Sequence, residues 1–150
     1  MIIGLNKIGY GLYLKMLEDA LATLSGDDKG EKKSVDIKLA ISAYISEDYI
    51  HEDRVRLELY RRLSKAGDIQ EVYQIEEEME DRFGKLDIFT KQFIELIIIK
   101  ILALNKGISN ISSYEMNVTF TKADDTKETI KSPSRDDDDV INTTLQYLRK

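Results

Sequence analysis

The most apolar stretch of the chain is residues 89–104, in which isoleucine, leucine and phenylalanine predominate. Its charged interruptions, Lys91, Glu95 and Lys100, leave almost no continuous polar face, so a helix formed here has to be covered by its neighbours. The stretch is also shorter than the roughly 20 apolar residues that a membrane-spanning helix needs. The pattern therefore predicts a central buried helix over 89–106, around which the other segments pack.

Capping residues delimit this helix and the one before it. Asp87 is a candidate N-cap for the apolar helix, and Gly107 supplies the left-handed stop that a helix C-terminus favours. Asp68 is followed three residues later by Glu71, which is the spacing of a capping box. We expect the helix that begins after Asp68 to end at Gly84.

Three further segments carry apolar residues at helical spacing, namely residues 8–24, residues 53–65 and the segment after Pro133. In the last segment, Ser134 and Asp137 predict a capping box at the start of a final helix. The sequence thus predicts about five helices.

Two regions switch to a period of two, which is typical of strands. Residues 34–43 alternate apolar and polar side chains and predict one belt strand. Beyond Gly107, the alternation around Val118 and Phe120, followed by polar turn residues, predicts a small C-terminal β-hairpin. The predicted fold class is therefore α+β and mostly helical.

The size of the chain favours one domain. With 150 residues and 42% hydrophobic content, it can bury a single core, so we expect one domain over residues 1–150. Residues 25–33 form a mixed-charge run with glycine, which predicts a flexible loop. Residues 1–8 are too short for a signal peptide and contain Gly4 and Asn6, so we expect no signal peptide there.

Composition narrows the function classes. The net charge of −6 disfavours a surface that tracks nucleic-acid phosphates. The absence of cysteine excludes disulfide frameworks and thiolate zinc sites, and it makes the cytoplasm the natural compartment. No glycine-rich phosphate loop is present, so we expect no nucleotide cofactor.

Candidate catalytic and metal-binding residues have simpler explanations. Four consecutive aspartates, residues 136–139, stand in the first turn of a predicted helix, where acids satisfy N–H groups, and their side chains point in different directions. His51, the only histidine, has no accompanying nucleophile and is interpreted as a solvated turn residue. The sequence predicts no catalytic residue, no cofactor and no metal.

Two charged surfaces remain as candidate binding sites. An acidic stripe consisting of Glu71, Gln74, Glu78 and Asp81 lies opposite the apolar side of its helix, either as a solvated face or as a reversible docking surface. A basic set in residues 53–65 has the spacing to contact phosphate, although neighbouring acids more simply pair with it; its members are Arg54, Arg56, Arg61 and Arg62, and the acids are Glu52, Asp53 and Glu58.

Three motifs together resemble the C-terminal domain of the bacterial transcription-repair coupling factor family (TRCF). They are IGYGLYLKMLEDAL at 8–21, VDIKLAISAYISEDYIHEDRVRLELYRRLSKA at 35–66 and EEEMEDRFG at 76–84. The resemblance covers residues 8–107 in the family's order, with His51 where the family usually has proline. The predicted hairpin and last helix therefore rest on pattern alone. Residues 1–7 do not fit the residues that precede these motifs in the family, and the comparison suggests that they are the start of an excised fragment.

The resemblance implies a regulatory domain without catalysis. Its parent would be an ATP-driven DNA translocase in transcription-coupled DNA repair, and the domain would dock on an N-terminal UvrB-like module, mask the UvrA-binding surface and restrain the motor. RNA polymerase would be an indirect partner, and neither a membrane nor nucleic acid a direct one. The family's docking acids match Glu78 and Asp81. Two alternatives remain: an independent protein-binding adaptor and a DNA-binding accessory domain.

Overall fold

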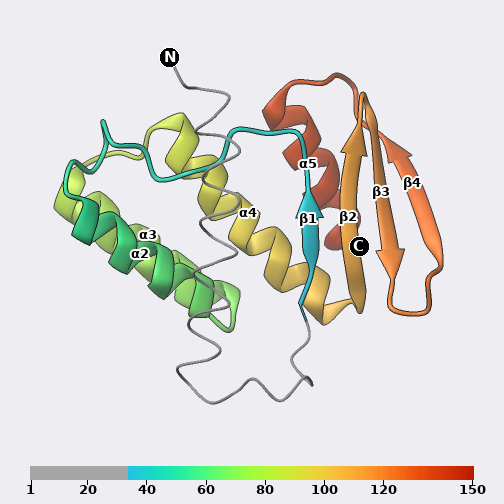
Figure 1. Ribbon diagram of the computed structural model, residues 1–150, viewed down its shortest axis with the longest axis horizontal. Helices are drawn as coiled ribbons and strands as arrows, with labels where there is room; N and C mark the ends of the chain where they lie inside the picture. Colours follow the sequence, from blue (N-terminus) through green and yellow to red (C-terminus); the bar gives the residue numbers. More distant parts are fainter. Residues whose placement is uncertain (1–33) are drawn as a thin grey trace. The chain divides into compact units, whose positions relative to one another are not determined.

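A computed structural model of the chain describes residues 34–150. The predicted helix at 8–24, the predicted loop at 25–33 and the interpretation of residues 1–7 lie outside the described residues. In chain order the elements are β1 (Asp36–Lys38), α2 (Asp53–Lys65), α3 (Ile69–Phe83), α4 (Ile88–Asn105), β2 (Ile108–Tyr114), β3 (Asn117–Lys122), β4 (Lys127–Lys131) and α5 (Asp137–Leu148) (Figure 1). The predicted α+β class is confirmed.

The described residues divide into two compact units. One consists of Ala43–Ile97, and the other of residues 34–42 together with Ile98–Lys150. The apolar helix α4 belongs to both, because its first half lies in the first unit and its second half in the second. The prediction of one domain over residues 1–150 stays a prediction. Within residues 34–150, no helix combines the length and the apolar character needed to cross a bilayer.

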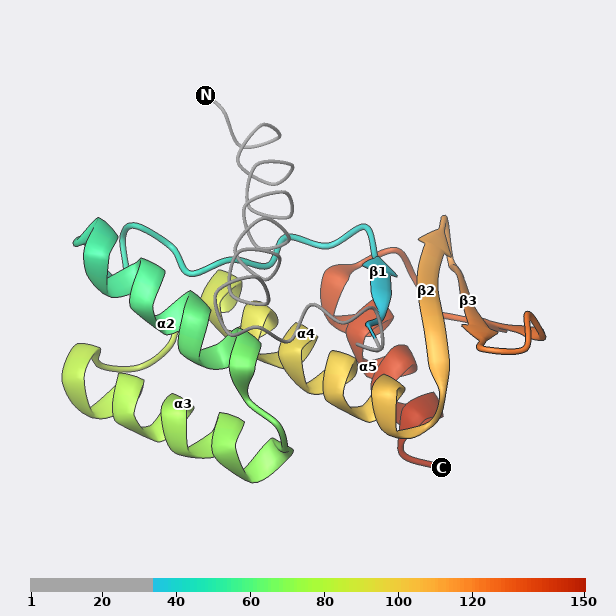
Figure 2. The same ribbon diagram turned by 60° about the horizontal axis from the view of Figure 1, so that its bottom comes forward.

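The first unit is built on the helical hairpin of α2 and α3, which run antiparallel beside each other (Figure 2). Helix α2 has the predicted bounds, 53–65. Tyr60 ties this hairpin to its surroundings: its hydroxyl accepts a hydrogen bond from the Ile45 N–H at 2.8 Å, and its ring meets Phe93 of α4 edge-on at 5.0 Å. The buried apolar residues of the unit include Leu59, Leu63, Val72, Ile75, Met79, Ile94 and Ile97.

The predicted N-cap at Asp87 is confirmed. Its carboxylate accepts a hydrogen bond from the Thr90 N–H at 2.9 Å, and its second oxygen accepts one from the Ser46 hydroxyl. The Ser46 oxygen in turn accepts from the Tyr49 N–H at 3.0 Å, while the Ser46 N–H donates to the Thr90 hydroxyl at 3.3 Å. Asp87 therefore fixes the loop before α2 as well as the start of α4.

Replacing Asp87 by alanine is expected to destabilise the chain by about 1–2 kcal/mol, because a lost N-cap alone typically costs about 1 kcal/mol and Ser46 loses its acceptor as well. Urea unfolding measures the difference. Asp136→Ala is the matched control, since Asp136 is the N-cap residue of α5 but makes no side-chain capping bond. Its expected loss is about 0.5 kcal/mol or less, from the helix dipole. Equal losses for the two variants would contradict the assigned role of Asp87.

The second unit contains a four-stranded sheet in the order β1-β2-β3-β4. Strand β1 pairs parallel to β2, while β2 with β3 and β3 with β4 are antiparallel. The predicted small hairpin is thus present as β3 and β4, and β2 extends it on the other side of β3. The belt strand predicted over 34–43 is wrong in length, because β1 ends at Lys38. Beyond it the chain turns, and the Ile41 N–H donates to the Leu39 carbonyl at 2.9 Å.

Helix α5 lies against β3, where Tyr147 stacks on Phe120 at 3.9 Å between ring centroids. The capping box predicted from Ser134 and Asp137 is wrong, because the helix begins at Asp137 with Asp136 as its N-cap residue, and Ser134 lies outside it. Instead, the Ser134 hydroxyl donates to Asp139 at 2.7 Å. The Asp137 carboxylate accepts a hydrogen bond from the Ser42 N–H at 2.9 Å and so ties the segment after β1 to α5.

Candidate protein-docking face on helix α3

The predicted acidic stripe lies along α3. Glu71, Gln74 and Asp81 are exposed, and Glu78 is half-buried. Their spacing of three, four and three residues keeps them on one side of a helix with 3.6 residues per turn. Val72, Ile75 and Met79 are buried on the other side. We refer to Glu71, Gln74, Glu78 and Asp81 as the docking face.

The N-terminus of α3 is capped as predicted. The Asp68 carboxylate accepts a hydrogen bond from the Glu71 N–H at 2.8 Å. The Glu71 carboxylate accepts one from the Gly67 N–H at 3.1 Å, one residue earlier than in a standard capping box. Glu71 is thus partly committed to holding the start of the helix.

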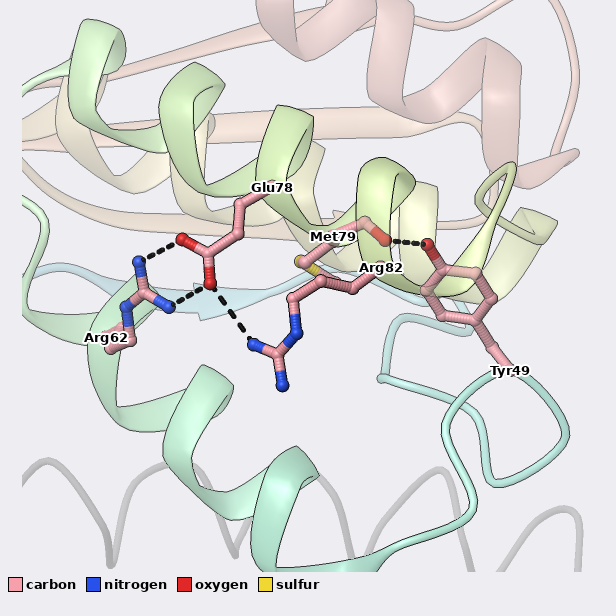
Figure 3. Close-up of polar contacts among 5 residues, drawn as sticks. All are labelled: Tyr49, Arg62, Glu78, Met79 and Arg82. Atoms are coloured by element: carbon pink, nitrogen blue, oxygen red, sulfur yellow. Dashed lines mark hydrogen bonds and ion pairs between the residues drawn. The ribbon is translucent and has the colours of Figure 1, made fainter.

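Glu78 is held by two arginines (Figure 3). Arg62 of α2 donates one hydrogen bond to each carboxylate oxygen, both at 2.8 Å, and Arg82 approaches one of these oxygens at 3.2 Å. The bidentate bond to Arg62, followed by the contact with Arg82, lowers the pKa of Glu78 from 4.5 to about 2. Glu78 therefore stays ionised and joins α2 to α3.

The C-terminus of α3 is fastened by Tyr49 (Figure 3). Its hydroxyl donates to the Gly84 carbonyl at 2.6 Å and lies 3.2 Å from the Met79 carbonyl, and its ring packs edge-on against Phe83 at 6.1 Å. Burial, with a smaller contribution from nearby acids, raises the pKa of Tyr49 to about 12, so the hydroxyl stays a donor. Gly84 has a φ of 90°, a conformation that favours glycine.

These anchors make the docking face rigid. The N-terminus of α3 is capped by Asp68, and Glu78 and Tyr49 tie its centre and its C-terminus to other parts of the first unit, so a partner would lose little conformational entropy on binding there. The face is acidic and polar, which suits reversible recognition of a basic partner. Within it, Asp81 and Gln74 are exposed, whereas Glu78 is already engaged by Arg62 and Arg82.

Replacing Glu78 by glutamine is expected to lower the stability of the chain at neutral pH by about 1 kcal/mol, a value limited by solvent screening of a carboxylate that is 39% exposed. Because folding lowers this pKa, the stabilisation is present above 4.5 and is lost as the pH falls through about 2. Chemical denaturation at several pH values should show the two proteins converging over this range. Glu77→Gln, at an exposed acid of the same helix, should change little. A difference that persists unchanged at the lowest pH would contradict this role of the pair.

The structure divides the basic set of α2. Arg56 donates to the carbonyls of Ile50 at 2.6 Å and His51 at 3.1 Å and also pairs with Asp53, so it closes the N-terminus of the helix. Arg62 pairs with Glu78 of α3, which corrects the expectation that neighbouring acids on α2 pair with the set on one exposed face. Arg54 and Arg61 remain exposed. The four arginines therefore do not form one phosphate-binding surface.

The residues considered as catalytic or metal-binding candidates are either exposed or engaged in local hydrogen bonds. His51 is exposed in the turn before α2, as interpreted from the sequence. Of the four aspartates at 136–139, Asp137 accepts from Ser42 and Asp139 accepts from Ser134. Among residues 34–150, no group of three or more histidine or acidic side chains has the geometry to hold a metal ion.

Comparison with known proteins identifies the family. The model of the TRCF domain matches residues 39–132, which is more than half of the chain. The chain belongs to the TRCF domain family. This match extends past Gly107, where the motif-based resemblance ended, and includes β2, β3 and β4.

Curated relatives of this TRCF domain are named transcription-repair-coupling factors. The chain is 48% identical over 145 residues to the protein of Helicobacter pylori (strain ATCC 700392 / 26695), covering 97% of the chain and 14% of that protein. It is 28% identical over 109 residues to the protein of Staphylococcus haemolyticus, covering 71% of the chain and 9% of that protein. The chain thus spans a small part of the length of these relatives.

A solved structure shares the fold. The TRCF domain described here superposes on a crystal structure of the C-terminal domain of a transcription-repair coupling factor with a TM-score of 0.61, covering 78% of this chain and 94% of that one. Since the two sequences are 14% identical, this likeness concerns the fold. The α+β architecture is therefore that of a TRCF C-terminal domain.

Proposed function

We propose that this TRCF domain is the autoinhibitory domain of a transcription-repair coupling factor that acts in the bacterial cytoplasm. It docks through α3 on the UvrB-like module in the N-terminal part of the same protein, covers the surface that binds UvrA and restrains the ATP-driven motor. The domain itself performs no chemistry and needs no cofactor. Release, triggered when RNA polymerase is engaged, makes the parent protein competent for repair.

The observation that carries this proposal is the docking face. Its acids are presented by a helix that is capped at Asp68 and is tied to other parts of the first unit through Glu78 and Tyr49, so the surface is already ordered before a partner arrives. A polar face of this kind gives a closed state that a competing partner can open, since an allosteric coupling is typically only about 1–3 kcal/mol. Membership in the TRCF family supports the partner assignment.

The test is charge reversal at Asp81 in the intact coupling factor, with basal ATPase rate and UvrA binding as the measured quantities. Glu78 is unsuitable as the primary site, because an arginine there would face Arg62 and Arg82 and would disturb the α2–α3 hairpin itself. If the domain were an independent adaptor, neither quantity would change, while its binding to an external protein would.

A further inference from the structure

The α2–α3 hairpin carries two oppositely charged ridges. The basic ridge is on α2 and consists of the exposed residues Arg54, Leu57, Arg61 and Lys65, of which Leu57 is 41% exposed. Glu58, also exposed, lies among them and offsets one positive charge. The acidic ridge is on α3 and consists of the exposed residues Gln70, Tyr73, Gln74, Glu77 and Asp81, of which Tyr73 is 42% exposed.

Both ridges face the same way. Leu59 and Leu63 of α2 and Val72 and Met79 of α3 point into the buried side of the hairpin, opposite the ridges. Arg62 of α2 and Glu78 of α3 form their ion pair between the two ridges, where the helices adjoin (Figure 3). A shallow groove lined by Arg62, Lys65, Glu71, Gln74, Ile75 and Glu78 runs between the ridges. The outer surface of the hairpin is therefore basic on one side of the groove and acidic on the other.

We propose that this surface binds a second copy of the same chain. A two-fold axis that runs along the groove, parallel to the helices, turns one hairpin over onto the other. It places the basic ridge of each copy on the acidic ridge of its partner, and the contact is made twice, as in an isologous dimer. An axis at right angles to the helices would instead set like charges against each other.

The axis also fixes the register, because rotation about it leaves the position along the helices unchanged. The ion pair between Arg62 and Glu78 shows that these two residues lie at the same height along the helices. Because the helices run antiparallel, a residue one position later on α2 lies level with a residue one position earlier on α3. Arg61 of one copy then lies at the level of Met79 of the other, between Glu77 and Asp81. Lys65 lies at the level of Ile75, between Gln74 and Glu77. Arg54 falls beyond Phe83, where α3 ends.

The size of the surface sets the strength of the contact. In this register, α2 of one copy faces α3 of the other only along residues 75–83 of α3. An overlap about 13 Å long across two helices about 10 Å apart gives a footprint on the order of 300 Å² per copy. The total, about 600 Å², is far below the roughly 1,200–2,000 Å² of stable complexes, so we expect weak association with a dissociation constant on the order of 100 µM or above. Association carried by exposed charges should weaken further as salt screens them.

This inference does not rest on the proposed autoinhibition. It concerns the chain alone, and its basic ridge takes no part in the docking face. Since the dimer would cover Gln74 and Asp81, self-association and intramolecular docking would exclude each other.

Sedimentation equilibrium of the 150-residue chain tests the proposal from about 10 µM to about 1 mM, a range that brackets the expected dissociation constant. The chain is expected to dimerise at about 50 mM salt and to be largely monomeric at about 500 mM. Two double variants make both ridges alike: Arg61→Glu with Lys65→Glu makes them acidic, and Glu77→Lys with Asp81→Lys makes them basic. Each should be monomeric alone, and an equimolar mixture should form a heterodimer tighter than the unmodified dimer.

Arg54→Glu is the control, because it reverses one charge of the same ridge at a position outside the expected register. Its dissociation constant should stay within about twofold to threefold of the unmodified value, whereas each double variant should lose at least about tenfold. Circular dichroism is used to check that each variant is folded. A chain that stays monomeric at about 1 mM in low salt, or folded double variants whose mixture does not associate, would overturn the proposal.

Discussion

An intact coupling factor carrying Asp81→Arg is expected to hydrolyse ATP in the absence of RNA polymerase at least about fivefold faster than the unmodified protein, and to bind UvrA more tightly. Releasing a coupling of about 1–3 kcal/mol corresponds to a factor of about 5–150 in the closed-to-open equilibrium. Asp81 is an exposed acid near the C-terminus of α3, so its reversal repels a basic partner without removing a buried contact. Steady-state ATPase assays and surface-immobilised UvrA measure the two quantities.

Glu47→Arg is the appropriate control, because Glu47 is an exposed acid of the same unit that lies in the loop before α2 and outside the docking face. It introduces the same charge change and should leave both quantities near their unmodified values. Adding Gln74→Arg to Asp81→Arg should increase the effect, since Gln74 lies on the same side of α3. Unchanged ATPase and UvrA binding in the double variant, with the protein folded, would remove the docking role of α3.

The helices of the first unit were predictable from the sequence because their signals are local. The cap predicted at Asp68 and the stop predicted at Gly84 lie within one segment, and α3 follows them to within a residue. The same is true of α4, whose cap at Asp87 and stop at Gly107 bracket the apolar stretch. Periodicity and capping reflect backbone hydrogen bonding over a few residues, which a single sequence records.

The features that the sequence did not reveal depend on partners far along the chain. The alternation at 34–43 fits a longer strand, but β1 is limited to the three residues that pair with Asn110–Ser112 of β2. Likewise, the stripe on α3 identified Glu78 as an exposed acid, whereas its pairing with Arg62 depends on the angle at which α2 packs. Local pattern places a side chain on a face of its helix but leaves open which neighbour it meets.

Truncating Phe93 to alanine is expected to destabilise the first unit by about 3–5 kcal/mol, which is typical of a large aromatic removed from a core. Phe93 is 1% exposed, and its ring contacts the ring of Tyr60, whose hydroxyl also accepts a hydrogen bond from the Ile45 N–H. The variant therefore leaves a cavity beside α2 and loosens the support of the hairpin that presents α3. Thermal or urea unfolding, followed by circular dichroism, measures the loss.

The decisive comparison is with Phe89→Ala, one turn earlier on the same helix. Phe89 stacks on Tyr44 at 5.0 Å but is 36% exposed, so its truncation removes less buried area and leaves a gap that water can fill. We expect a loss of about 1 kcal/mol, several times smaller than for Phe93. Because a destabilised hairpin presents the docking face less rigidly, Phe93→Ala in the intact protein should also raise basal ATPase, in proportion to its loss of stability. Equal losses for the two variants would contradict the assignment of Phe93 to the core of the first unit.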